Sequence, residues 1–153
     1  MSLDRRHFLS VSASMIGALV AGVALPFRLL AQQARPDAGF AATDLASAYA
    51  ALGGNPEPSN DIVFTSPEIA ENGAVVPVSV VSNIAGTTKI SILVEKNPNP
   101  LTAVFYITEG TEPSIQTRVK VAQTCNLYAV VEANGKLFSA SRETKVTLGG
   151  CGG

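Results

Sequence analysis

Short apolar runs separated by turn residues fill the chain from Asp61 to Leu148, at a spacing of about ten residues. No helical segments alternate with these runs, which argues against a parallel α/β arrangement. Seven or eight short strands in this pattern predict an antiparallel β-sandwich. The candidate strands are Asp61–Phe64, Val75–Val81, Thr88–Glu95, Ala103–Thr108, Ser114–Val121, Leu127–Ala133, Lys136–Ser141 and Glu143–Leu148.

Local signals refine this prediction. Apolar and polar residues alternate along 114–121 and again along 145–148, so one side of each segment is expected to be buried and the other to face water. Asn134-Gly135 lies between two apolar runs and predicts a type I′ hairpin turn. Pro77 interrupts the run VVPVSVV and therefore predicts an edge strand or a bulge at that point.

One helix is predicted, from Thr43 to Leu52, because its apolar residues recur at helical spacing. Thr43 or Asp44 can cap its first turn, and Gly53-Gly54 can end it. With this packing helix, the expected division of the chain is 1–31, an export signal; 32–60, a linker and the helix; 61–148, the sandwich; and 149–153, a C-terminal arm.

The N-terminus resembles a twin-arginine export signal. Arg5-Arg6 is followed by Phe8-Leu9 and by an apolar run from Val11 to Leu25. A membrane anchor is the alternative, but this run is shorter than the roughly 20 apolar residues that a spanning helix needs. We expect cleavage near residues 31–34 and a mature protein in the periplasm. Because the twin-arginine route carries folded proteins, it also suggests export together with a folded partner.

Composition excludes several classes of function. The only histidine, His7, lies in the expected signal, so the mature domain has none for a Ser-His-Asp triad, a Cys-His pair or a zinc site. Of 11 basic and 12 acidic residues, Arg5, Arg6, Arg28 and Asp4 precede residue 31, which leaves 8 basic and 11 acidic residues and a net charge of −3. A mildly acidic domain without a basic cluster is not expected to bind nucleic acid.

The most informative candidate site is Cys151, which lies in a C-terminal arm of glycines directly after the last expected strand. Glycine carries no Cβ and adopts both signs of φ, so the arm is expected to be flexible. No residue in the arm can activate the thiol, and we therefore interpret Cys151 as an attachment point and not as a nucleophile acting alone. The four glycines are Gly149, Gly150, Gly152 and Gly153.

Two alternatives for the cysteines remain open. A terminal glycine-rich tail is often simply frayed, and Cys151 can form a disulfide with Cys125, since two cysteines allow one bridge. Cys125 lies at the junction of two expected strands and is interpreted as a buried structural residue. Under this hypothesis the protein is a structural or binding β-sandwich whose cysteines form a disulfide.

The C-terminal sequence Val146-Thr147-Leu148-Gly149-Gly150-Cys151-Gly152-Gly153 is similar to that of the SoxY family of sulfur carriers. The stretch from Glu68 to Val78 (EIAENGAVVPV), the sequence Glu95-Lys96-Asn97-Pro98, the alanine-rich helix and the twin-arginine leader add to this resemblance. Together these segments span nearly all of the expected mature domain. Cys125 is not part of the motif.

The resemblance implies an immunoglobulin-like sandwich and a covalent carrier that is not itself an enzyme. Cys151 would hold intermediates of thiosulfate oxidation, first an S-thiosulfonate and then a persulfide, and would present them to other proteins. The implied partners are SoxZ, as the second subunit of a heterodimer, and SoxAX, SoxB and in some organisms SoxCD, as transient partners. The chain is expected to hold no cofactor and no metal of its own.

Overall fold

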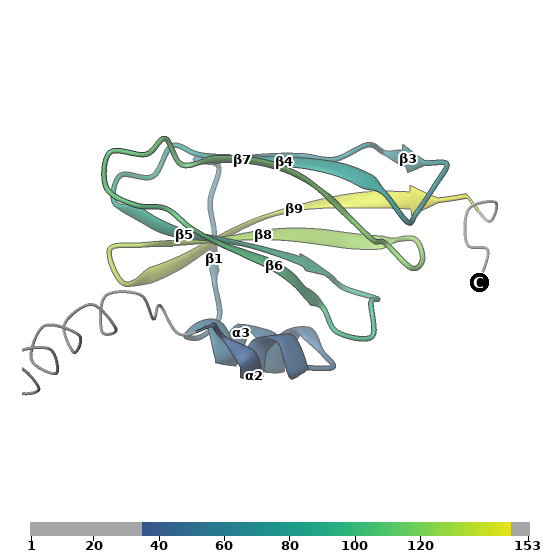
Figure 1. The fold of residues 1–153 in the computed structure, drawn as a ribbon, viewed down its shortest axis with the longest axis horizontal. Helices are drawn as coiled ribbons and strands as arrows, with labels where there is room; N and C mark the ends of the chain where they lie inside the picture. Colours follow the sequence, from purple (N-terminus) through teal and green to yellow (C-terminus); the bar gives the residue numbers. More distant parts are fainter. Residues whose placement is uncertain (1–34, 148–153) are drawn as a thin grey trace, which may run out of the picture. The chain divides into compact units, whose positions relative to one another are not determined.

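Two β-sheets packed face to face make up the domain (Figure 1). The structure is a computed structural model and describes residues 35–147. In that range the larger sheet has six strands, in the order β1-β9-β8-β5-β6 with β3 beside β9, and the smaller sheet has the order β2-β4-β7. The prediction of a mainly β, immunoglobulin-like sandwich with a short N-terminal helix is confirmed.

The strands follow the expected segments closely, and Asn134 and Gly135 both have positive φ, as a type I′ turn requires. Two strands were not expected, because two-residue pairings have no periodicity to detect. The bounds are Glu57–Pro58 (β1), Ile62–Thr65 (β2), Ile69–Ala70 (β3), Val76–Ser82 (β4), Thr87–Val94 (β5), Leu101–Tyr106 (β6), Ser114–Val119 (β7), Cys125–Ala133 (β8) and Lys136–Val146 (β9).

The last two expected strands are one strand in the structure. β9 runs without a break from Lys136 to Val146 because it pairs with β8 along its length, from Ala133↔Lys136 to Cys125↔Thr144. The expected break lay at Arg142, but the charged residues around it are accommodated within the strand because most side chains in this part of β9 are exposed.

The prediction that Pro77 belongs to an edge strand or a bulge is wrong. Pro77 lies in β4, the central strand of the smaller sheet. The N–H of Asn83 donates to the carbonyl oxygen of Asp61, on the side of β4 where β2 lies. Because alternate residues of a strand direct their backbone N–H groups to the same neighbour, the nitrogen of Pro77 also points to the β2 side. β2 ends at Thr65, opposite Ser79, so no strand lies where the nitrogen of Pro77 points.

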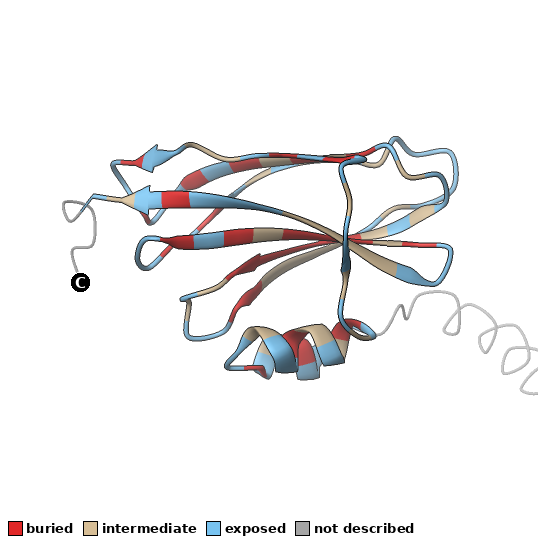
Figure 2. Ribbon diagram, turned by 180° about the vertical axis from the view of Figure 1, so that it is seen from behind, coloured by how far each residue is buried: buried red, intermediate tan, exposed pale blue. Residues whose placement is uncertain are grey.

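The hydrophobic core has two parts, one on each face of the larger sheet. Figure 2 marks the buried residues of the strands and helices in red. The main cluster lies between the sheets and includes Ile90, Ile92 and Val94 of β5. The second cluster lies against the helices and includes Leu93 and Val130. β5 is buried on both faces over its second half, which is why its sequence is a continuous apolar run.

Two short helices, Asp37–Ala41 (α2) and Leu45–Leu52 (α3), cover the outer face of the larger sheet (Figure 1). α3 is the expected packing helix. The side chain of Asp44 caps it by accepting a hydrogen bond from the N–H of Ser47 at 2.8 Å, and Gly53, with φ of 123°, ends it. α2 falls in a stretch that was expected to be a linker. The division of the chain at residues 31, 60 and 148 stays a prediction.

Candidate functional site

The residues singled out by sequence gather at one end of the sandwich, where β9 ends (Figure 1). The stretch 68–75 and the loop 95–100 lie there, although 19 residues, 76–94, lie between them in the chain. We call this the arm-bearing end and define it as residues 66–75, 95–100, 120–125 and 145–147. Cys151, Gly149, Gly150, Gly152 and Gly153 follow it in the sequence and lie outside the described residues.

The last residues of β9 are held by hydrogen bonds on both sides. The N–H of Lys145 donates to the carbonyl oxygen of Glu68 at 2.8 Å, and the N–H of Thr147 donates to that of Ala70 at 3.2 Å. On the other side, the N–H of Val146 donates to Oγ1 of Thr124 at 3.0 Å. The chain is therefore anchored up to Thr147, four residues before Cys151.

Thr144 adds a buried anchor to the same strand. Its side chain is completely buried, and its hydroxyl donates to the carbonyl oxygen of Pro67 at 2.9 Å and lies 3.1 Å from Oγ of Ser66. A buried hydroxyl stabilises a structure only where it finds such a partner. Thr144 thus ties the end of β9 to the segment that leads into β3.

Gly73 holds the β3–β4 connection close to the end of β9. A Cβ on this residue would lie 2.4 Å from the carbonyl oxygen of Val121 and 2.9 Å from Cγ1 of Val146. Its own carbonyl oxygen accepts a hydrogen bond from the N–H of Val121 at 2.7 Å. Only glycine fits between Val121, which follows β7, and Val146 of β9, which accounts for the glycine in the stretch Glu71-Asn72-Gly73.

Asn97 connects two loops of the arm-bearing end. Its Nδ2 donates to the carbonyl oxygen of Lys120 at 2.8 Å, while its Oδ1 accepts from the N–H of Ala122 at 3.1 Å. Glu95 connects the same loop to β8, because its Oε2 accepts a hydrogen bond from the backbone N–H of Asn126 at 3.2 Å. The Glu95-Lys96-Asn97-Pro98 sequence therefore fixes neighbouring chain segments.

Cys125 is a free thiol at the start of β8 and is 5% exposed. It belongs to the cluster between the sheets. Burial raises its pKa, because a low-dielectric surrounding disfavours the thiolate. This environment matches the expected structural role of Cys125.

The charged side chains of the arm-bearing end lie mostly on its surface. No group of three or more His, Cys, Asp or Glu side chains that could hold a metal ion is found within residues 35–147. Glu68, Glu71 and Lys145 are exposed. Over the same residues, no helix is long and apolar enough to cross a membrane. This end of the domain holds residues 145–147 by hydrogen bonds, directly before the segment that contains Cys151.

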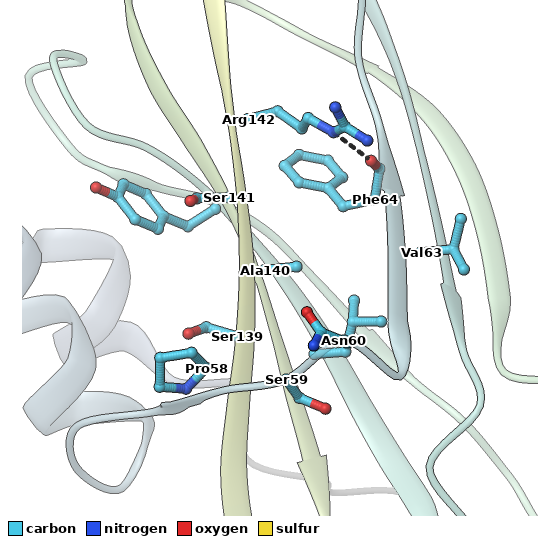
Figure 3. A pocket seen from close by; sticks show the side chains of 11 residues that line it. Pro58, Ser59, Asn60, Val63, Phe64, Ser139, Ala140, Ser141 and Arg142 are labelled. Atoms are coloured by element: carbon cyan, nitrogen blue, oxygen red, sulfur yellow. Dashed lines mark hydrogen bonds between the residues drawn. The ribbon is translucent and has the colours of Figure 1, made fainter.

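A cavity of about 580 Å³ opens along the side of the sandwich, where the chain leaves β1 and crosses to the smaller sheet (Figure 3). Ser139, Ser141 and Arg142 of β9 line one wall and Phe64 of β2 lies opposite. Nε of Arg142 donates to the carbonyl oxygen of Phe64 at 3.1 Å and bridges the opening. The residues lining it include no cysteine and no carboxylate.

Sequence reasoning missed the groups that anchor β9, namely Ser66, Thr124 and Thr144. Threonine and serine in strands and loops are common, and nothing in their spacing indicated which would be buried. It also missed the apolar side chains of Ile69 and Val75, which are 61% and 52% exposed beside the end of β9. Their position next to buried Ala70 and Val76 fits the alternation of a strand, but β3 is too short to be recognised.

Comparison with known proteins agrees with this arrangement. The family model "Sulfur oxidation protein SoxY" matches residues 48–151. The solved structure of the sulfur carrier protein SoxY from Chlorobium limicola f thiosulfatophilum shares 44% sequence identity, covers 70% of this chain and 95% of its own, and superposes with a TM-score of 0.63. No curated protein sequence matches.

A chain of the solved structure "Structural basis of T cell specificity and activation by the bacterial superantigen toxic shock syndrome toxin-1" shares 13% identity with a TM-score of 0.39, over 56% of this chain and 99% of its own. No conclusion rests on it.

The fold and the family match define a β-sandwich of the sulfur-carrier class, built around an anchored final strand. The chain belongs to the SoxY family of sulfur oxidation proteins.

Proposed function

We propose that this protein carries the sulfur intermediates of thiosulfate oxidation covalently on Cys151 and presents them to partner enzymes. The observation that carries the proposal is the extent of the family match, which continues beyond the folded strands through the arm and ends at residue 151, the cysteine itself. A carrier needs no catalytic group, in keeping with the absence of a histidine after His7 in the sequence.

In the proposed cycle, the Cys151 thiolate and the sulfane sulfur of thiosulfate form an S–S bond, and two electrons pass to the haem protein SoxAX. The product is a cysteine S-thiosulfonate. Water then attacks the sulfonate sulfur on SoxB, which releases sulfate and two protons and leaves a persulfide anion on Cys151. SoxCD, where present, oxidises that sulfur further. This chain supplies the thiol and its position, and the partners supply the chemistry.

We further propose that the protein works in the periplasm as a heterodimer with SoxZ. The support for export is the sequence Arg5-Arg6-His7-Phe8-Leu9 followed by an apolar run, which is typical of twin-arginine signals. Because this route transports folded proteins, a partner without its own signal would be exported with this chain after the two have assembled.

Two structural observations support a carrier over a disulfide-stabilised binding module. The base of the arm is held at Thr147 by β3 and, one residue earlier, by Thr124, so the tethered thiol starts from a defined point. Cys125, the other possible bridge partner, is 5% exposed within the core. A bridge between the two cysteines would require the arm to reach into that core.

The test is thiosulfate oxidation by the reconstituted system with Cys151→Ser and, as the matched control, Cys125→Ser. We expect the first variant to lose thiosulfate-dependent electron transfer completely while it still binds SoxZ, and the second to retain it. Activity in Cys151→Ser would refute the carrier function. Loss of activity in both variants, with free thiols absent from the wild-type protein, would instead support a disulfide.

A further inference from the structure

Two exposed apolar side chains lie beside the anchored end of β9. Of the large hydrophobic residues in 35–147, four are exposed: Val63 (50%), Ile69 (61%), Val75 (52%) and Tyr106 (37%). Ile69 lies in β3, and Val75 lies at the end of the connection that leads from β3 to β4. Ile69 pairs with Lys145 of β9, and the carbonyl oxygen of the next residue, Ala70, accepts the N–H of Thr147.

Val75 is held near the same point by Gly73. Gly73 packs so closely on β9 that its added Cβ would lie 2.9 Å from Cγ1 of Val146. Val75 follows two residues later, so its Cα is at most about 7 Å from that of Gly73. Both exposed side chains are therefore within a short distance of Thr147, where the chain leaves the domain.

The length of the arm determines what must approach this surface. Cys151 is the fourth residue after Thr147, and four extended residues reach at most about 14 Å. An enzyme that takes the Cys151 sulfur into an active site must bring the opening of that site within this distance. The surface around Thr147, including Ile69 and Val75, is then covered by the enzyme.

We propose that Ile69 and Val75 form a docking surface for apolar side chains on the rim of the active site of an enzyme that acts on the Cys151 sulfur. The inference rests on the carrier function proposed above. Glu68 and Glu71 are exposed near Ile69 in the sequence, and exposed Lys145 pairs with Ile69; since these charges are of both signs, neither a strongly acidic nor a strongly basic rim is favoured. The contact is therefore apolar and depends little on salt.

The experiment compares Ile69→Thr/Val75→Thr with Val63→Thr, all of which keep a β-branched side chain. Val63 is a matched control, since it is equally exposed but pairs with Val81, toward the other end of β4. The carriers, each in complex with SoxZ, are loaded by exchange with tetrathionate, in which the Cys151 thiolate forms the S-thiosulfonate and thiosulfate leaves. Release of sulfate by SoxB is then measured against carrier concentration.

We expect the double variant to raise KM about tenfold, as loss of a small interface anchor does, with kcat unchanged and the same increase at low and high salt. Val63→Thr should behave as the wild type. Alkylation of Cys151 by iodoacetamide should proceed at equal rates in all three proteins, since docking plays no part in it.

An unchanged KM, or an equal rise in Val63→Thr, would overturn the docking surface while leaving the carrier function intact. Loss of SoxZ binding by the double variant would also overturn it, because it would assign the surface to the contact between subunits. Failure of the wild-type protein to accept sulfur on Cys151 would refute the carrier function itself, and with it this inference.

Discussion

Of the two cysteines in the sequence, Cys125 is the one that the structure describes, and its surroundings do not favour a reactive thiol. Cys125 is 5% exposed, lies among apolar side chains, and has a pKa raised by burial. Only the thiolate attacks electrophiles and sulfur compounds, so burial and the raised pKa both lower the reactivity of Cys125. Under the proposed function a difference in reactivity between the two cysteines is useful, because a second reactive thiol would compete with Cys151 for the sulfur intermediates.

This difference predicts selective labelling. Iodoacetamide at neutral pH should modify Cys151 in the native protein, whereas Cys125 should react only after unfolding in denaturant. Because the pKa of Cys125 is raised, its thiolate fraction at any given pH is lower than that of an ordinary cysteine. Peptide mass spectrometry after timed labelling measures both sites, and equal rates in the native protein would contradict the burial of Cys125.

Gly73 gives a second prediction at this scale. Its φ is not positive, so Gly73→Ala adds only a steric conflict, with the carbonyl oxygen of Val121 and with Val146. A backbone carbonyl cannot move aside cheaply. We expect the free energy of unfolding to fall by about 1–3 kcal/mol, measured by urea denaturation with an unchanged slope. A variant as stable as the wild type would mean that the β3–β4 connection does not pack closely on β9.

Among the elements, β9 is the strand that leads to the segment with Cys151. Its pairings show which contacts the sequence could predict and which it could not. Its pairing with β8 follows from Asn134-Gly135 and from two apolar runs, and was predicted. Its pairing with β1 and β3 involves two residues each, too few for any periodic signal. Pro77 was misjudged for a related reason: β2 is shorter than β4, and strand lengths in a neighbour cannot be derived from the sequence of the strand itself.

Thr144 tests the anchoring of β9. Thr144→Val keeps the shape of the side chain but removes its hydrogen bond to the carbonyl oxygen of Pro67. Leaving a buried acceptor unpaired costs about 1–3 kcal/mol, so the thermal midpoint should fall and the amides of Lys145 and Thr147 should exchange faster with deuterium.

The control for this experiment is Thr65→Val on β2, where the side chain is exposed and replacement should leave stability nearly unchanged. Equal stability of Thr144→Val and the wild type would show that the end of β9 is held by its backbone pairing alone.

On the scale of the whole molecule, the sandwich brings residues distant in sequence to the end where the arm begins. The strand count and spacing were enough to predict two packed sheets. They were not enough to predict that the stretch 68–75 and the loop 95–100 share an end with β9, because this depends on strand order, which only the pairing of the sheets reveals. The side cavity near Arg142 was missed for the same reason, since it forms where the chain crosses between sheets.

The most direct test of the central claim is mass spectrometry of the C-terminal peptide of protein purified without reductant, before and after thiosulfate is supplied together with the partner proteins. The carrier function predicts a thiosulfonate or persulfide mass on Cys151 that appears with thiosulfate and disappears with reductant. Cys151 found only in a disulfide with Cys125, and unchanged by thiosulfate, would contradict it.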